Sequence, residues 1–125
     1  MRVSTNLLVY NLSQPVKSLI KVDYCDSFLR KFLGLMLRKS IGEFEGILLV
    51  GKKESKYGVA IHMMFMRFDI CVIWINSSEQ VVDKCIAKRW KPYCAPSVPA
   101  KYILETHVNR YADFDIGDQI KIERL

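Results

Sequence analysis

The stretch DICVIWIN at residues 69–76 decides the fold of this chain. Both of its alternating faces are apolar, with Ile70, Val72 and Trp74 on one side and Cys71, Ile73 and Ile75 on the other. Successive side chains of a strand point to opposite faces, so a strand that is apolar on both must be covered on both. We therefore predict a strand that lies in the middle of the fold.

Apolar or alternating runs on both sides of this stretch predict further strands. They occupy residues 20–24, 46–50, 59–66, 81–87, 101–106 and 119–123. Residues 76–79 are typical of a hairpin turn, residues 108–112 of a short helical turn, and residues 116–118 of a second tight turn. Pro92, Pro96 and Pro99 predict an irregular loop, because proline cannot donate to a sheet ladder.

One helix is expected near the N-terminus. There the apolar residues stop alternating with polar ones and instead recur every three or four positions, as on one face of a helix. The residues at this spacing are Phe28, Leu29, Phe32, Leu33 and Met36. Asp26 or Ser27 can cap its start and Gly34 can end it. The fold class is therefore mostly β (α+β), a compact single-domain β-sandwich or barrel-like fold over residues 1–125. Residues 1–19 form an additional N-terminal strand or extension.

Size and composition are those of one globular domain. Half of the 125 residues are hydrophobic, which lets the chain fold without a disulfide or metal. No window resembles a membrane span or a secretory signal, so we expect a cytoplasmic protein without a membrane partner. The four cysteines include no CxxC pair, and we expect them to be thiols.

The formal charge of +6 is concentrated at the N-terminal end, where residues 1–40 hold seven basic and two acidic side chains. A basic end can attract phosphate-rich partners, but scattered lysines on a solvated surface give the same composition. Residues 88–93 interleave the cations Lys88, Arg89 and Lys91 with the aromatic residues Trp90 and Tyr93. This loop can stack bases, or it can insert Trp90 as a plug into one end of the barrel, and we favour the plug.

From Asp26 onward, six motifs occur in an order that resembles the prokaryotic family called domain of unknown function 192. They are Gly-Leu-Met-Leu-Arg at 34–38, Glu-Gly-Ile-Leu-Leu at 45–49, Ile-His-Met-Met-Phe at 61–65, Val-Val at 81–82 with Trp90 and Pro92, Ala-Lys-Tyr-Ile-Leu-Glu at 100–105, and Gly-Asp at 117–118. The similar region covers about residues 20–125. The resemblance implies a compact β-rich fold and no assigned biochemical activity.

The chain departs from the family pattern at two places. The family strand that reads Pro-x-Asp has Asp69 at the proline position and Cys71 at the aspartate position. Asp69 can present a carboxylate on the same face, about 7 Å along the strand, so the family aspartate is either moved or lost here. A family glycine is replaced by Asn109, which tolerates a positive φ.

Five polar or aromatic residues within the motif-bearing segments form the candidate pocket at one end of the sheet. They are Arg38, His62, Asp69, Trp90 and Glu105. Arg38 can hold a carboxylate or phosphate, or it can form an internal salt bridge with Asp69 or Glu105. His62 can act as a general base or be a half-buried, hydrogen-bonded residue. His107 is expected to be exposed and to have no role.

No cofactor or metal is expected, because no nucleotide-binding motif is present and the Cys and His spacing fits no zinc site. We favour a non-catalytic binding or interaction module for a small anionic ligand or a protein partner. A small enzyme that uses His62 or Asp69 as acid and base, with Arg38 as anion holder, is the alternative. Nucleic-acid binding through residues 88–93 is a further alternative that we do not expect.

Overall fold

The computed structural model describes residues 6–14, 20–25, 39–56, 63, 66–90 and 94–124. Seven strands and one 3-10 helix occupy these residues. Their bounds are β1 (Asn6–Asn11), β2 (Ile20–Cys25), β3 (Glu45–Ser55), β4 (Ile70–Ile75), β5 (Val81–Ala87), β6 (Ala100–Thr106), η2 (Val108–Asp113) and β7 (Ile120–Arg124). The mostly β fold class is confirmed. The expected helix at residues 28–36 lies outside the described residues.

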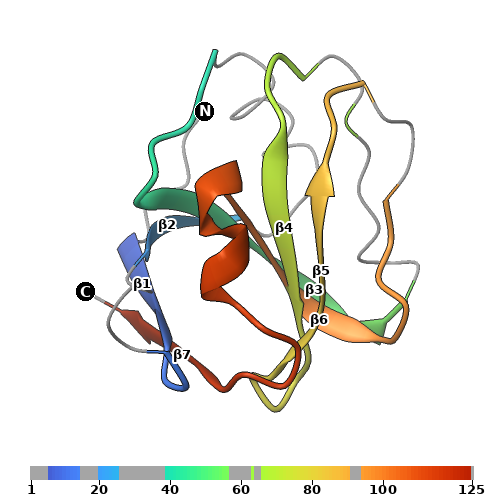
Figure 1. Cartoon of the computed structure of the whole chain (residues 1–125). Helices are drawn as coiled ribbons and strands as arrows, with labels where there is room; N and C mark the ends of the chain where they lie inside the picture. Colours follow the sequence, from blue (N-terminus) through green and yellow to red (C-terminus); the bar gives the residue numbers. More distant parts are fainter. Residues whose placement is uncertain are drawn as a thin grey trace.

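The strands form one curled sheet in the order β5-β4-β6-β3-β2-β1-β7, a half-barrel (Figure 1). Only β2 and β3 run parallel among these neighbours, and β1 lies between β2 and β7. The two edge strands meet at one end of the sheet. There Val81 N donates to Asp118 O at 2.9 Å and Ile120 N donates to Glu79 O at 2.7 Å. These bonds close the half-barrel at that end.

Strand β4 separates two hydrophobic cores, and all six of its residues are buried. Core 1 takes one face of β4 with parts of β3 and β6, and core 2 takes the other. Core 1 comprises Ile41, Ile47, Leu49, Met63, Met66, Ile70, Val72, Trp74, Ala87, Cys94, Ala100 and Ile103. Core 2 comprises Leu7, Val9, Ile20, Val22, Leu48, Cys71, Ile73, Ile75, Val81, Leu104, Phe114 and Ile120. The prediction of a central strand that is covered on both faces is confirmed.

The turn after β4 was also predicted correctly, and its geometry explains why the sequence favours it. The Asn76 side-chain oxygen accepts hydrogen bonds from the backbone N–H of Ser78 and of Gln80, both at 3.0 Å. Such a side chain closes a turn by replacing a backbone acceptor. Glu79 has a φ of +61°, in the left-handed region. The chain thereby reverses into β5.

The expected strand at residues 59–66 is wrong at the two positions that the structure describes. Met63 and Met66 lie in no strand, and Met66 N donates to Met63 O at 3.1 Å. Both side chains are buried in core 1. An apolar run shows that a segment is buried, but it does not distinguish a strand from an irregular segment that covers a sheet.

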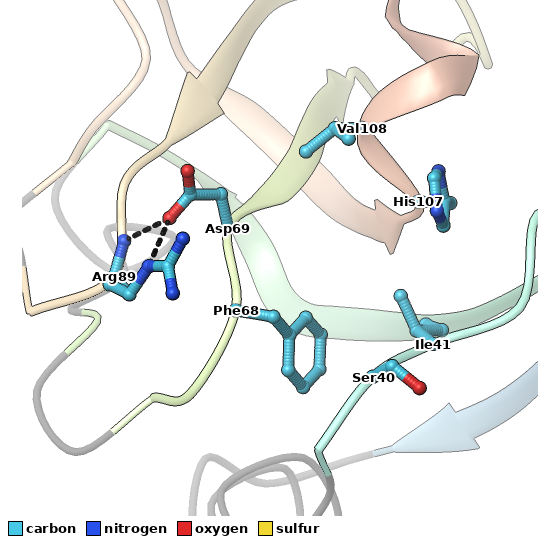
Figure 2. A pocket seen from close by; sticks show the side chains of 7 residues that line it. All are labelled: Ser40, Ile41, Phe68, Asp69, Arg89, His107 and Val108. Atoms are coloured by element: carbon cyan, nitrogen blue, oxygen red, sulfur yellow. Dashed lines mark hydrogen bonds and ion pairs between the residues drawn. The ribbon is translucent and has the colours of Figure 1, made fainter.

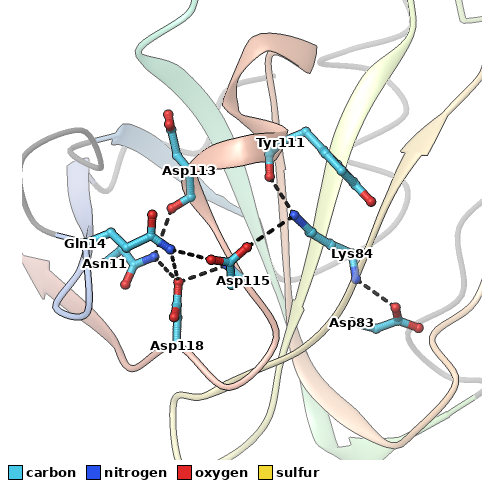
Figure 3. A network of polar contacts seen from close by, with 8 residues as sticks. All are labelled: Asn11, Gln14, Asp83, Lys84, Tyr111, Asp113, Asp115 and Asp118. Carbon is cyan, nitrogen blue, oxygen red and sulfur yellow. Dashed lines mark hydrogen bonds and ion pairs between the residues drawn. The ribbon is translucent and has the colours of Figure 1, made fainter.

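A polar network fixes the chain beside the closed end of the sheet (Figure 3). The Asp118 carboxylate accepts from Asn11 Nδ2 and Gln14 Nε2, both at 2.7 Å, and from Asp115 N at 2.9 Å. Asn11 is fully buried and also donates to the Asp113 carbonyl at 3.0 Å. The network therefore ties the end of β1 to the segment between η2 and β7.

These contacts make stability depend on the charge of Asp118. Burial is the largest single influence and raises the pKa of this carboxyl, but the bonds from Asn11, Asp115 and Gln14 together lower it below its usual value. A lowered folded-state pKa contributes stability that is present above the unfolded pKa, about 3.9, and is lost as the pH falls through the folded value.

We expect Asp118→Asn to lower the free energy of unfolding by about 1 kcal/mol at about pH 6, since solvent screens a partly exposed carboxylate. The difference from the wild-type protein should shrink below about pH 4. Urea denaturation at several pH values measures both. The exposed Glu123→Gln variant is the matched control. If the difference in the free energy of unfolding between the two proteins stays constant down to about pH 2.5, the charge of Asp118 does not contribute to stability.

Candidate functional site

A pocket of about 230 Å³ lies at the end of the sheet where β4 begins and β6 ends (Figure 2). It is lined by Ser40, Ile41, Phe68, Asp69, Arg89, His107 and Val108. These residues come from four separate segments of the chain: the approach to β3, the approach to β4, the turn after β5, and the passage from β6 into η2. The fold therefore brings distant parts of the sequence to one place.

Asp69 and Arg89 form an ion pair at one side of the pocket (Figure 2). The Asp69 Oδ1 atom accepts from the backbone N–H of Arg89 at 2.8 Å and from its side-chain Nε at 3.2 Å. Lys88 Nζ lies 3.9 Å from Oδ2. The Arg89 backbone bond is the largest influence on the pKa of Asp69 and, with both cations, lowers it, while burial opposes the effect.

The turn that carries Arg89 is held at two backbone positions. Arg89 N donates to Asp69, and Trp90 N donates to the Met63 carbonyl at 2.7 Å. Trp90 has a φ of +66°, which is uncommon for a bulky residue and persists where surrounding contacts enforce it. Its side chain is 53% exposed, so the expectation that Trp90 plugs the barrel is wrong. The two anchored N–H groups direct the side chain outward.

His107 links the pocket to the 3-10 helix. Its Nδ1 atom accepts from Asn109 N at 3.0 Å and caps the start of η2. In a neutral ring, the other nitrogen, Nε2, therefore carries the hydrogen and can donate it. The side chain is half-buried, which corrects the expectation that it is exposed. Asn109 lies within η2 and has no positive φ, so it does not replace a family glycine in that way.

The remaining lining residues make an apolar wall with one hydroxyl. Ile41 belongs to core 1, and the half-buried Phe68 packs against that core. Val108 is the first residue of η2. Ser40 is exposed and adds a hydroxyl group. In Figure 2 the Phe68 ring lies between the Asp69–Arg89 pair on one side and Ile41 with Ser40 on the other.

Glu105, two residues before the lining residue His107, is buried with an exposed fraction of 0%. It lies in β6, opposite Val72 of β4 and Ile47 of β3. Both neighbours belong to core 1, so Glu105 places a carboxylate among apolar side chains. It precedes His107 by two residues, a distance of about 7 Å along an extended chain. Its carboxyl group is therefore near the pocket along the chain but is not part of the lining.

The five sequence candidates fall into four groups. Asp69 lines the pocket, Glu105 is buried without lining it, and Trp90 follows the lining residue Arg89 without lining the pocket itself. Arg38 and His62 lie outside the described residues. Sequence reasoning missed Arg89 and His107 as lining residues. The available signals were the cations that follow β5 and a histidine two residues before Asn109, a spacing that suits a side-chain cap.

Cys71 cannot take over the chemistry of a family aspartate. It is fully buried in core 2, and burial, the main cause, raises the pKa of its thiol to about 12. The carboxylate available at this end of β4 is that of Asp69.

Among the residues that the structure describes, no cluster of three or more Cys, His, Asp or Glu side chains could hold a metal. No helix in the same residues is both long and apolar enough to cross a membrane.

The family described as "Uncharacterized ACR", the domain of unknown function 192, matches residues 11–122. The UPF0127 protein TK1120 of Thermococcus kodakarensis is 41% identical over 102 residues, which cover 80% of this chain and 63% of that protein. The UPF0127 protein PF1050 of Pyrococcus furiosus is 33% identical over 117 residues, which cover 92% and 97%. This chain thus spans less than two thirds of the Thermococcus relative.

Two solved structures share the fold. A "putative transcription regulator" from Sinorhizobium meliloti has a TM-score of 0.80 at 16% identity and covers 97% of this chain and 95% of its own. A protein of unknown function from Novosphingobium aromaticivorans has a TM-score of 0.76 at 14% identity, with 93% and 83% covered. At such low identity these likenesses concern the fold alone.

The Asp69 contacts generate a prediction about the turn at residues 88–90. We expect Asp69→Ala to speed hydrogen exchange of the Arg89 amide about 10- to 100-fold, because a hydrogen bond to a charged acceptor is worth about 1.5–3 kcal/mol. Asp69→Asn keeps an acceptor oxygen and should show a smaller change. NMR-detected exchange measures both variants. Unchanged Arg89 protection in Asp69→Ala would show that the turn does not depend on this carboxylate.

Proposed function

The chain belongs to the Uncharacterized ACR family, and from that premise we propose that it is a non-catalytic binding module for a small carboxylate with an apolar body. The observation that carries this proposal is the pocket itself, where the Arg89 guanidinium stands beside an apolar wall. Ligand sites commonly combine a mostly apolar lining with a few polar groups that orient the ligand. For the whole protein, we likewise propose ligand binding rather than catalysis, with a small carboxylate as the partner.

The polar groups at the pocket favour an anion. Within the described chain, Arg89 uses Nε for Asp69 and Nη1 for the Arg67 carbonyl at 3.5 Å, which leaves Nη2 to donate to a ligand. His107 Nε2 and the Ser40 hydroxyl are further donors. Arg89 and Lys88 both place positive charge beside Asp69, the one carboxylate among the lining residues. Arginine's planar set of N–H groups suits a carboxylate in particular.

The size and the wall of the pocket limit the ligand. A volume of about 230 Å³ is below the range of about 300–1,000 Å³ that is usual for drug-sized ligands. Phe68 offers a ring for stacking, and Ile41 and Val108 offer aliphatic surface. One ring or a short aliphatic chain with one carboxylate fits these constraints.

Acid–base catalysis receives less support. Asp69 accepts from Arg89 twice, and these contacts lower its pKa. A general base works best with a pKa near the working pH, so a carboxylate stabilised in its charged form is a poor base. His62, the other acid–base candidate, lies outside the described residues. For nucleic-acid binding, the exposed Trp90 offers a stacking surface, but Tyr93, the second aromatic residue of that loop, lies outside the described residues.

We further propose that Arg38 compensates the charge of Glu105. A buried carboxylate costs several kcal/mol unless a cation and hydrogen bonds stabilise it. Asp69, the other acidic candidate, already has Arg89. Arg38 precedes the lining residue Ser40 by only two positions in the sequence, which supports the proposed pair. We also propose a cytoplasmic location, which fits a module for a small metabolite.

Benzoate is the probe for the pocket, because it combines one ring with one carboxylate. We expect calorimetry to give a Kd of about 1 mM for so small a ligand, and Arg89→Gln to weaken binding at least about tenfold. Arg124→Gln, an exposed arginine in β7, is the matched control and should bind normally. Benzamide, which lacks the charge, should bind more weakly than benzoate. Equal binding of benzoate and benzamide, or normal binding by Arg89→Gln, refutes the proposal.

A double-mutant cycle tests the Arg38–Glu105 pair. We expect Arg38→Ala alone to lower the free energy of unfolding by about 3–5 kcal/mol, because it leaves a buried charge without its partner. In a Glu105→Gln background the same change should cost much less, which gives a coupling energy above about 1 kcal/mol. The parallel cycle with Asp69→Asn is the control and should show little coupling. Thermal melts or urea titrations supply the values, and additive effects at Arg38 and Glu105 would exclude the pair.

A further inference from the structure

Two cysteine side chains meet where the chain leaves β5 and returns to core 1. Cys85 lies in β5, Cys94 lies beyond the turn that carries Arg89, and their sulfur atoms are 2.9 Å apart. The S–S bond of a disulfide is about 2.05 Å long, so a small movement brings the pair to bonding distance. We propose that Cys85 and Cys94 are a redox pair whose disulfide closes the loop at residues 86–93.

The surroundings of the two thiols assign them an order of reaction. Cys85 is half-buried, whereas Cys94 has an exposed fraction of 9% and belongs to core 1. A small oxidant therefore reaches Cys85 first. Cys71 is the internal contrast, because its thiol is fully buried with its pKa raised to about 12 and does not supply a thiolate.

A low-molecular-weight disulfide such as oxidised glutathione can act as the oxidant. The Cys85 thiolate attacks one of its sulfurs, which forms a mixed disulfide and releases one glutathione thiolate. The Cys94 thiolate then attacks the Cys85 sulfur, which forms the protein disulfide and releases the second glutathione thiolate. The protein loses two electrons and two protons. The small disulfide gains the two electrons, and the protons pass to solvent or to the released thiolates.

Such a bond constrains the part of the chain that supplies Arg89. The turn at residues 88–90 already contains Trp90 with a φ of +66° and two backbone bonds to Asp69 and Met63. A covalent link between the ends of the loop reduces its freedom to leave this conformation, as cross-links generally do. An effect on ligand affinity follows only if the pocket binds a carboxylate as proposed above, whereas the disulfide itself does not depend on that function.

Peptide mapping tests the pair directly, because all four cysteines lie on different tryptic peptides. Cys25 is in 22–30, Cys71 in 68–84, Cys85 in 85–88 and Cys94 in 90–101. After treatment of the folded protein with oxidised glutathione and blocking with N-ethylmaleimide, we expect peptide 85–88 linked to peptide 90–101. Oxidation should raise Tm by about 5–15 °C, an effect that dithiothreitol reverses.

Variants separate this pair from other thiol chemistry. Cys94→Ser should hold glutathione on Cys85 and lose the rise in Tm, while Cys71→Ala should keep both the linked peptide and the rise. Glutathione that remains on Cys85 of the wild-type protein without any linked peptide overturns the proposal. A link from either residue to Cys25 overturns it equally. Peptide mapping of the wild-type protein tests the disulfide even if one of these variants fails to fold.

Benzoate titration of the reduced and oxidised forms tests the connection to the pocket. We expect the oxidised form to bind at least about threefold more tightly, because preorganisation reduces the cost of ordering the loop. Equal affinities of the reduced and oxidised forms for benzoate would show that the disulfide does not affect the pocket. If the linked peptide forms and neither form binds benzoate, the proposed function fails and the redox pair stands. If no linked peptide forms, the redox pair fails whatever benzoate does.

Discussion

The burial of β4 on both faces is the constraint on which the rest of this structure depends. Its six residues are all buried, and alternate side chains enter different cores. A sheet with one solvated face cannot satisfy such a strand. Core 2 is enclosed because the sheet curls until β7 meets the start of β5. Core 1 is covered instead by residues outside the strands, among them Ile41, Met63 and Met66.

The candidate site arises where that irregular cover ends. Segments without a strand partner must satisfy their backbone groups in other ways, and here a side chain does so: Asp69 accepts the N–H of Arg89. The same contact holds the guanidinium at the edge of the pocket. His107 behaves similarly, since its ring caps η2 and also lines the pocket. The contacts that stabilise the chain at the strand ends thus also position the polar groups of the pocket. Binding residues commonly lie on loops that a rigid scaffold holds in place.

Local patterns predicted what depends on local physics. The alternation in residues 70–75 and the turn at Asn76 were readable because strand period and side-chain turns act over a few residues. Met63 and Met66 were mistaken for strand residues, since burial alone does not fix backbone pairing. Trp90 was expected inside because of its apolar ring. The turn that carries it is held by bonds from Arg89 to Asp69, 20 residues earlier, and from Trp90 to Met63, which no local pattern reveals.

A crystal structure of the protein with benzoate tests most directly whether the pocket holds a carboxylate beside an apolar wall. The account predicts the benzoate carboxylate within hydrogen-bond distance of the Arg89 guanidinium and the ring against Phe68, with the Asp69–Arg89 contacts retained. Benzoate bound elsewhere on the protein, or in the pocket with its carboxylate turned away from Arg89, would contradict it.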